Sequence, residues 1–205
     1  YSLTLKEGMK YAFSQKTILL FCLIALFLNG IIVPLNSLQA PLISEVLGGG
    51  ATSLSVMGIS ISLSMLTGSV LYPMIHKRVT GKQLCIFSSI GLACFYLGIV
   101  ACRPFYTSEL ISDIILAVLI FILGFAVALI NSFASVELIK RVEQDYLARV
   151  VALFTALTVA VNPVISFLLT GLTRILSTVS IFLIAGILAV IMTFFMISNK
   201  TLKEV

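Results

Sequence analysis

The chain has 205 residues, of which 60% are hydrophobic and only 10% are charged, and its mean hydropathy is +1.19. A soluble domain carries roughly a quarter charged residues, so this composition excludes a water-soluble globule. The net charge of +5 would suit nucleic acid as a partner in a soluble protein. Here the basic residues flank apolar segments, which indicates that they set membrane topology and argues against nucleic-acid binding.

Residues 1–16 predict a short amphipathic helix that lies against the cytoplasmic surface of the membrane. Thr4 and Glu7 have the spacing of a capping box, and the apolar residues fall on one face of the helix. Its lysines precede the first apolar segment, a position that favours the cytoplasmic side. Because the chain opens with Tyr1 and not with Met, we expect it to be part of a longer protein.

Six apolar segments follow, and we predict that each crosses the membrane as a helix. Crossing about 30 Å of hydrocarbon takes roughly 20 helical residues. Glycines at 48–50 and the Arg103-Pro104 pair break the chain between segments. The segments form a predicted bundle over 17–198, followed by a cytoplasmic tail at 199–205. They are predicted at 17–35 or beyond Pro41, 54–74, 84–101, 114–138, 150–171 and 179–198.

The flanking charges predict the orientation of the bundle. Eleven basic residues flank the segments on one side, whereas two, Arg103 and Arg174, flank them on the other. This bias alternates loop by loop, as six spans require, and positive residues concentrate on the cytoplasmic side. We therefore expect an all-α integral membrane protein of a bacterial cytoplasmic membrane, with both termini in the cytoplasm.

Polar side chains inside the apolar segments are costly unless they are partnered, so their positions are informative. They occur on the first, fourth and fifth segments, and the second is rich in Ser and Gly. At 100° per residue Asn29 and Asn36 share one face of a helix, and so do Thr158 and Asn162. We therefore expect the first, second, fourth and fifth segments to surround a polar cleft. The predicted solute-pathway residues are Asn29, Asn36, Gln39, Asn131, Thr158 and Asn162.

The fourth segment carries a stripe of small and polar residues, formed by Gly124, Ala128, Asn131 and Ser135. We interpret this stripe as part of the wall of the cleft. The alternative is that such residues hold helices together without any further function.

Prolines predict bends in two segments. Pro34 and Pro41 lie on the first segment, and Pro163 follows Asn162 in the middle of the fifth. Proline lacks the backbone donor of a helix interior and bends the helix at that point. Transporters tolerate such bends where a cavity satisfies the freed carbonyl groups.

Glu137 lies near the cytoplasmic end of the fourth segment and is the candidate within the spans for coupling transport to a proton or an ion. The alternative, which we favour, is an ion pair with Arg141 or Arg149. His76 lies among loop cations, and we interpret it as interfacial. The four cysteines lack the close pairs of a zinc or redox site, so we predict neither a disulfide nor a metal site.

The stretch 141–150 resembles the loop between the tenth and eleventh helices of major facilitator superfamily transporters, especially the macrolide-efflux-type branch. It keeps Arg149 and Val150 of the usual Gly-Arg-Val, but it has Glu143 and Ala148 where the branch usually has Pro and Gly.

Two other stretches agree with this resemblance. Residues 6–11 look like the helix that links the two halves of such a transporter. Residues 68–82 are similar to the cytoplasmic loop between helices eight and nine, and they keep Gly68, Lys77 and Arg78. The resemblance implies the C-terminal half of the fold, built as two inverted three-helix repeats and partnered by a missing N-terminal six-helix half.

The function implied by the resemblance is secondary active transport, namely efflux of a small hydrophobic or amphipathic solute by alternating access. One alternative is a membrane binding or structural module that has lost transport. Another is the membrane domain of a primary pump, which the short loops and the missing P-loop disfavour. We predict no enzymatic activity, because the expected spans hold no histidine base and no G-x-S-x-G nucleophile, and no cofactor. The predicted partners are the lipid bilayer, the solute and the N-terminal half.

Overall fold

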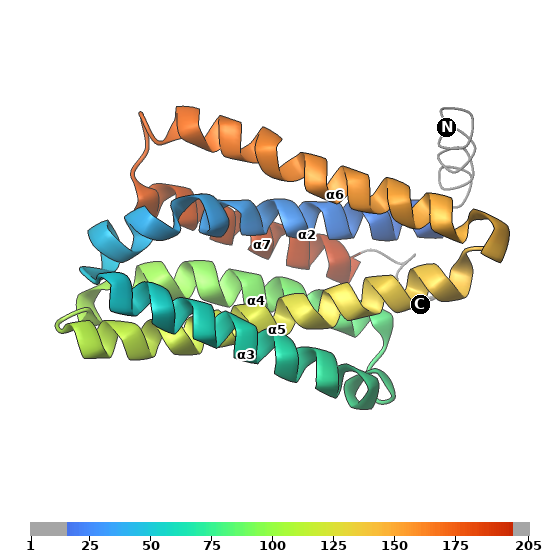
Figure 1. Ribbon diagram of the computed structural model, residues 1–205, viewed down its shortest axis with the longest axis horizontal. Coiled ribbons are helices and arrows are strands. Elements are labelled where there is room, and N and C mark those ends of the chain that lie inside the picture. Colours follow the sequence, from blue (N-terminus) through green and yellow to red (C-terminus); the bar gives the residue numbers. More distant parts are fainter. Residues whose placement is uncertain (1–15, 199–205) are drawn as a thin grey trace.

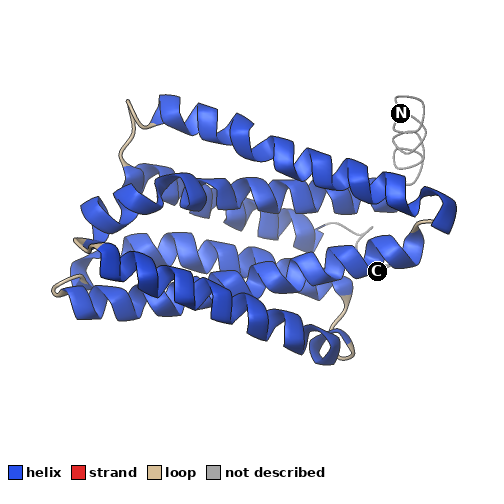
Figure 2. Cartoon of the chain, in the orientation of Figure 1, coloured by secondary structure: helices blue, strands red, loops and turns tan. Residues whose placement is uncertain are grey.

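The computed structural model describes residues 16–198, which form a bundle of long, roughly antiparallel helices (Figure 1). Short loops join the helices, and no strand occurs among the described residues (Figure 2). The predicted capping box at Thr4 and Glu7 and the tail at 199–205 lie outside the described residues. The elements are α2 (Lys16–Pro41), the π-helix η1 (Leu42–Leu47), α3 (Ala51–His76), α4 (Gly81–Ala101), the 3-10 helix η2 (Arg103–Phe105), α5 (Glu109–Arg141), α6 (Gln144–Leu172) and α7 (Thr178–Ser198).

Six of these helices are long and apolar enough to cross a membrane, as the sequence predicts, and they indicate an integral membrane protein. The first residues of α4 and α5 differ from the predicted ones, because an N-cap residue starts each of these helices earlier in the chain. α5 begins at Glu109, five residues before the predicted start, because the Ser108 hydroxyl accepts the backbone N–H of Ile111 at 3.4 Å. Thr80 and Gln83 form a capping box that starts α4.

The helices pack in a defined set of pairs. α3 packs against α5, α4 packs against both α5 and α7, and α2 packs against α6 and α7. α6 and α3 therefore lie at opposite edges of the bundle, as Figure 1 shows. Each of these two edge helices has few buried residues, because it has one principal neighbour in the chain.

α4 lies at the centre of the bundle and supplies the largest buried side chains. Phe95 and Tyr96 are fully buried, and both rings contact Phe182 of α7. The Tyr96 hydroxyl donates a hydrogen bond to the backbone carbonyl of Ile31 in α2. A buried hydroxyl without a partner would be costly, so this bond fixes α4 against α2.

Buried serines also join α4 to its neighbours. Ser88 Oγ donates to the carbonyl of Ala126 in α5 at 2.9 Å, and Ser89 Oγ donates to that of Ala189 in α7 at 3.0 Å. At Gly91 an added Cβ would lie 2.5 Å from the Cβ of Ala126. The absence of a side chain there lets α4 and α5 approach closely, which is typical of helix contacts inside membranes.

The predicted bend at Pro41 is confirmed. Leu38, three residues earlier, has non-helical dihedral angles of φ −116° and ψ 18°. The π-helix η1 follows the bend directly, and Gly48 ends it with a φ of 65°, which a glycine adopts without strain. Pro34 and Pro163 lie inside α2 and α6, and both helices continue through them.

Candidate functional site

α2 has a polar face and an apolar face. Asn29 and Asn36 share one side of the helix, whereas Phe27, Gly30 and Pro34 lie about 140° away around its axis. The apolar side faces α6 and α7, and it lines a cavity with them. The predicted pathway residues of α2 and this cavity therefore lie on different sides of the same helix.

The polar face of α2 is largely open. Asn36 and Gln39 are exposed, and the side-chain amide of Gln39 donates to the backbone carbonyl of Asn36 at 3.2 Å. Asn29 is half-buried and has a partner. The two exposed amides lie close to the bend at Leu38, in the half of α2 nearer its C-terminal end.

α6 and α2 share one hydrogen bond between hydroxyl groups. The Ser166 and Ser37 hydroxyl oxygens lie 2.9 Å apart and share a hydrogen bond between the two helices. Asn162 is exposed one turn before Ser166. The Thr158 hydroxyl donates within its own helix, at 3.0 Å to the carbonyl of Phe154. The structure thus joins α2 and α6 at Ser37 and Ser166, whereas Asn36 lies about 100° around the axis of α2 from Ser37.

The stripe on α5 is divided between two roles. Gly124 and Ala128 are buried against α3, where an added Cβ on Gly68 would lie 2.7 Å from the Cβ of Ala128. Asn131 is exposed, and its backbone carbonyl accepts the Ser135 hydroxyl at 2.9 Å. The buried part of the stripe packs helices together, as the alternative interpretation predicted, and only the Asn131 part is open.

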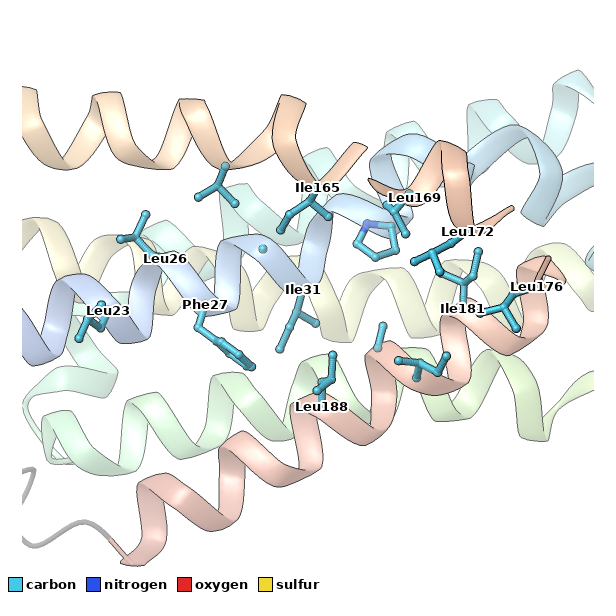
Figure 3. A pocket seen from close by; sticks show the side chains of 15 residues that line it. Leu23, Leu26, Phe27, Ile31, Ile165, Leu169, Leu172, Leu176, Ile181 and Leu188 are labelled. Atoms are coloured by element: carbon cyan, nitrogen blue, oxygen red, sulfur yellow. The ribbon is translucent and has the colours of Figure 1, made fainter. Parts of the chain in front are cut away.

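An apolar cavity of about 490 Å³ lies between α2, α6 and α7 (Figure 3). Leu26 and Phe27 of α2, Ile165 of α6 and Leu188 of α7 point into it. None of the described residues that line it is polar, and none is a predicted pathway residue. The cavity suits a hydrocarbon chain or an apolar solute, but its side chains offer no hydrogen bond that would orient one.

Glu137 forms the ion pair that we favoured. Its Oε2 accepts the Arg141 Nε at 2.6 Å, and its Oε1 lies 3.9 Å from the Lys140 Nζ. The Glu137 side chain is 9% exposed, so the pair is nearly shielded from water on the glutamate side. Such a charge-assisted hydrogen bond within one helix joins neighbouring turns of α5, which favours a structural role.

His76 is the last residue of α3, directly before Lys77 and Arg78, and its ring stacks on that of Tyr72 with centroids 5.3 Å apart. The ring also contacts Phe133 of α5 at 6.1 Å. The Nδ1 of His76 and the hydroxyl of Tyr72 are buried, and neither has a hydrogen-bond partner in the described part of the chain. Because its ring packs against α3 and α5, His76 belongs to the end of their seam.

The four predicted loop-motif residues occupy different environments. Lys77 and Arg78 are exposed in the turn after α3. Gly68 lies inside α3 and is buried in its contact with α5. Arg149 lies inside α6, where its guanidinium is 5.7 Å from the centre of the Tyr146 ring. Gly68 thus lies inside the second predicted span, as expected, whereas Arg149 lies inside α6, which begins at Gln144, before the predicted start at residue 150.

The opposite end of the α3–α5 seam holds a carboxylate that the sequence prediction missed. Asp113 is half-buried, and its Oδ1 is buried without a partner among residues 16–198. The hydroxyls of Ser53 and Ser112, near the starts of α3 and α5, are also buried without a partner among residues 16–198. The predicted span begins at residue 114, one residue after Asp113. Ser108 is the sequence signal for an earlier helix start, because serine is a preferred N-cap residue, and a helix that starts there includes Asp113.

Within residues 16–198, no group of three or more His, Cys, Asp or Glu residues could hold a metal ion. Cys85 is buried, whereas Cys94 is exposed and Cys102 is half-buried, and all three are free thiols. Comparison with protein-family models, with curated proteins and with solved structures finds no match for this chain.

Proposed function

We propose that this chain is half of a secondary active transporter, which moves a small hydrophobic or amphipathic solute by alternating access and exports it. The observation that carries the proposal is the open polar surface at membrane depth. Asn36, Gln39, Asn131 and Asn162 are all exposed on helices that are otherwise apolar. Such side chains facing lipid would be costly, so a water-filled space or a second bundle is expected to cover them.

The pairing of the helices supports a repeated architecture. Suppose that α2, α3 and α4 correspond to α5, α6 and α7 in that order. The packed pair α3–α5 then corresponds to the packed pair α6–α2, and the packed pair α4–α5 corresponds to the packed pair α7–α2. The α4–α7 pair corresponds to itself. Units of three spans must run in opposite directions, because each unit ends on the other side of the membrane. This correspondence favours two inverted repeats, the arrangement that rocks in alternating access.

The edge helix α6 favours a partner bundle, because almost none of its residues is buried. A second six-helix half would bury the polar faces of α2, α5 and α6 and leave the apolar faces to lipid. Motion between two such halves would keep the well-packed α4–α7 and α3–α5 pairs intact.

The charge distribution supports a cytoplasmic location of both termini. Of the nine basic residues within 16–198, seven lie toward the end where α2 begins and α7 ends. Arg103 and Arg174 lie in the loops at the other end. Positive residues concentrate on the cytoplasmic side of a membrane, and we place the protein in a bacterial cytoplasmic membrane on this basis.

A second candidate is a membrane module without transport activity. It is favoured by the state of Glu137, whose ion pair with Arg141 leaves this carboxylate unavailable for coupling. Such a module would bind an apolar ligand, for example in the α2–α6–α7 cavity, without moving it across the membrane.

The test is a transport assay on the complete protein in sealed vesicles, using a panel of fluorescent amphipathic dyes. Replacing Asn131 and Asn162 together by leucine should reduce the transport rate at least tenfold, since each site loses a polar contact worth about 1 kcal/mol or more. The matched control replaces Val159 and Val164, both exposed on α6, by leucine and should leave transport unchanged. Full transport by the Asn variant would remove these residues from the pathway, and dye binding without transport would favour the second candidate.

A further inference from the structure

The exposed side of α3 carries a continuous apolar stripe that ends in a pair of cations. The stripe residues follow each other at intervals of three or four positions, which keeps them on one side of a helix. Each of them is more than half exposed. The outer stripe consists of Ile59, Leu63, Leu66, Val70 and Met74.

Lys77 continues the register of the outer stripe, three residues after Met74, and Arg78 follows it. Both cations are exposed, and neither forms an ion pair with any residue between 16 and 198. Lys140 and Arg141, at the same end of the bundle, are engaged by Glu137. The Lys77–Arg78 pair is therefore positive charge that no described residue compensates, at the end of a membrane-spanning helix.

A surface groove of about 440 Å³ joins the stripe to the cations. It is lined by Met74, Ile75, Lys77, Arg78 and Val79. No described lining residue is acidic. Apolar side chains and two cations therefore share one concave surface, at the depth where the hydrocarbon of a bilayer meets its headgroups.

We propose that this groove binds an anionic phospholipid. The acyl chain lies along the outer stripe, and the phosphate of the headgroup contacts Lys77 and Arg78. A phosphate accepts paired hydrogen bonds from the planar fork of an arginine, and it also attracts the point charge of a lysine. Charge complementarity selects this occupant, because a zwitterionic lipid carries a compensating ammonium group and a covering helix would leave both cations unpaired. The proposal requires membrane insertion of the chain and does not require transport.

The chain contains no tryptophan, so a single engineered tryptophan reports on one place. Val70→Trp places the probe on the outer stripe, about 10 Å along the helix from Lys77. Ile59→Trp is the matched control, because it lies on the same stripe about 27 Å from Lys77. Both variants are reconstituted into vesicles, and their fluorescence is quenched with phosphatidylglycerol or phosphatidylcholine that carries brominated acyl chains.

The expected result is a preference for the anionic lipid at Val70→Trp of roughly five- to thirty-fold in apparent association constant. These limits correspond to one or two basic residues that each contribute about 1 kcal/mol near an anionic surface. The preference should decrease with added salt, because exposed charges are screened. Ile59→Trp should show a preference near one.

Charge variants in the Val70→Trp background complete the test. Lys77→Gln together with Arg78→Gln should abolish the preference, whereas Lys77→Arg together with Arg78→Lys should keep it. Both residues are exposed, so circular dichroism should show unchanged helix content in all variants. Equal quenching by the two lipids at Val70→Trp, a preference that survives Lys77→Gln and Arg78→Gln, or the absence of quenching by either lipid would each overturn the proposal. The last result would mean that protein, and not lipid, covers the outer stripe.

Discussion

Replacing Gly68 by alanine tests how tightly α3 packs against α5. An alanine Cβ at this position would lie 2.7 Å from the Cβ of Ala128 and 3.1 Å from the carbonyl oxygen of Phe125. The Phe125 contact is with backbone, which cannot rotate away, so the helices must separate. Overpacking of this kind costs about 1–3 kcal/mol, whereas alanine gains about 1 kcal/mol over glycine in a helix interior.

The matched control is Gly58→Ala on the same helix, where an added Cβ meets nothing within 4 Å. Both substitutions gain the same helix propensity, so the difference between them isolates the clash. We expect Gly68→Ala to be about 1–3 kcal/mol less stable than Gly58→Ala. The measurement is reversible unfolding in mixed micelles by titration with sodium dodecyl sulfate, followed by circular dichroism.

A second substitution tests the geometry directly. Ala128→Gly removes the nearer of the two contacts, so it should be less harmful in the Gly68→Ala background than in the parent chain. A double-mutant cycle then gives a favourable coupling of about 1 kcal/mol. Equal stability of Gly68→Ala and Gly58→Ala, or a coupling of zero, would refute the close approach of α3 and α5.

Two further predictions concern charges and the loop before α5. Glu137→Gln should lower the unfolding free energy by about 1–2 kcal/mol, because a charge-assisted hydrogen bond is lost and the 33% exposed Arg141 regains some water. Lys140→Gln, its control, should have less than about 0.5 kcal/mol of effect, and equal effects would contradict the assignment of the pair. Burial, with a smaller effect of Cys102, raises the pKa of Tyr106 to about 12. The folded protein therefore has the full contribution of the neutral Tyr106 phenol to its stability below about pH 10, the ordinary pKa of tyrosine. This contribution is lost as the pH rises through about 12. The difference between wild-type and Tyr106→Phe absorbance titrations at 295 nm should show a midpoint near pH 12, and a midpoint near 10 would contradict the burial.

The proposed transporter half and the proposed lipid groove use different surfaces of the bundle. The polar faces of α2, α5 and α6 would meet the solute or a second bundle. The outer stripe of α3 and the Lys77–Arg78 pair would meet lipid. Experiments on one surface therefore leave the other unchanged, and the two proposals can fail separately.

The number and order of the spans could be predicted from the sequence because they depend on local properties. A helix must contain about 20 apolar residues to cross the hydrocarbon core. The chain between helices is marked by the flexible glycines at 48–50 and by Pro104, which lacks a backbone N–H. The bend at Pro41 was predictable for the same reason, since proline lacks its own backbone donor. The ion pair between Glu137 and Arg141 follows from a spacing of four residues on one helix.

Which face of each helix meets which neighbour is a matter of tertiary structure. Helical periodicity places Gly124, Ala128 and Asn131 on one stripe, but the packing of α3 buries the first two and leaves Asn131 open. The sixth apolar segment is not among those predicted to surround a cleft, yet as α7 it forms one wall of the apolar cavity with α2 and α6.

Hydropathy and charge by themselves determined that this chain is built of six apolar helices with most of its cations at one end, because both depend on residues close together in the sequence. The tertiary structure alone decided that α6 and α3 lie at the edges, that α2 and α6 are joined at Ser37 and Ser166, and that Lys77 shares a groove with Met74. Inside a membrane all helices present similar apolar surfaces, so the choice of neighbours depends on the fit of small residues and on a few hydrogen bonds between distant segments.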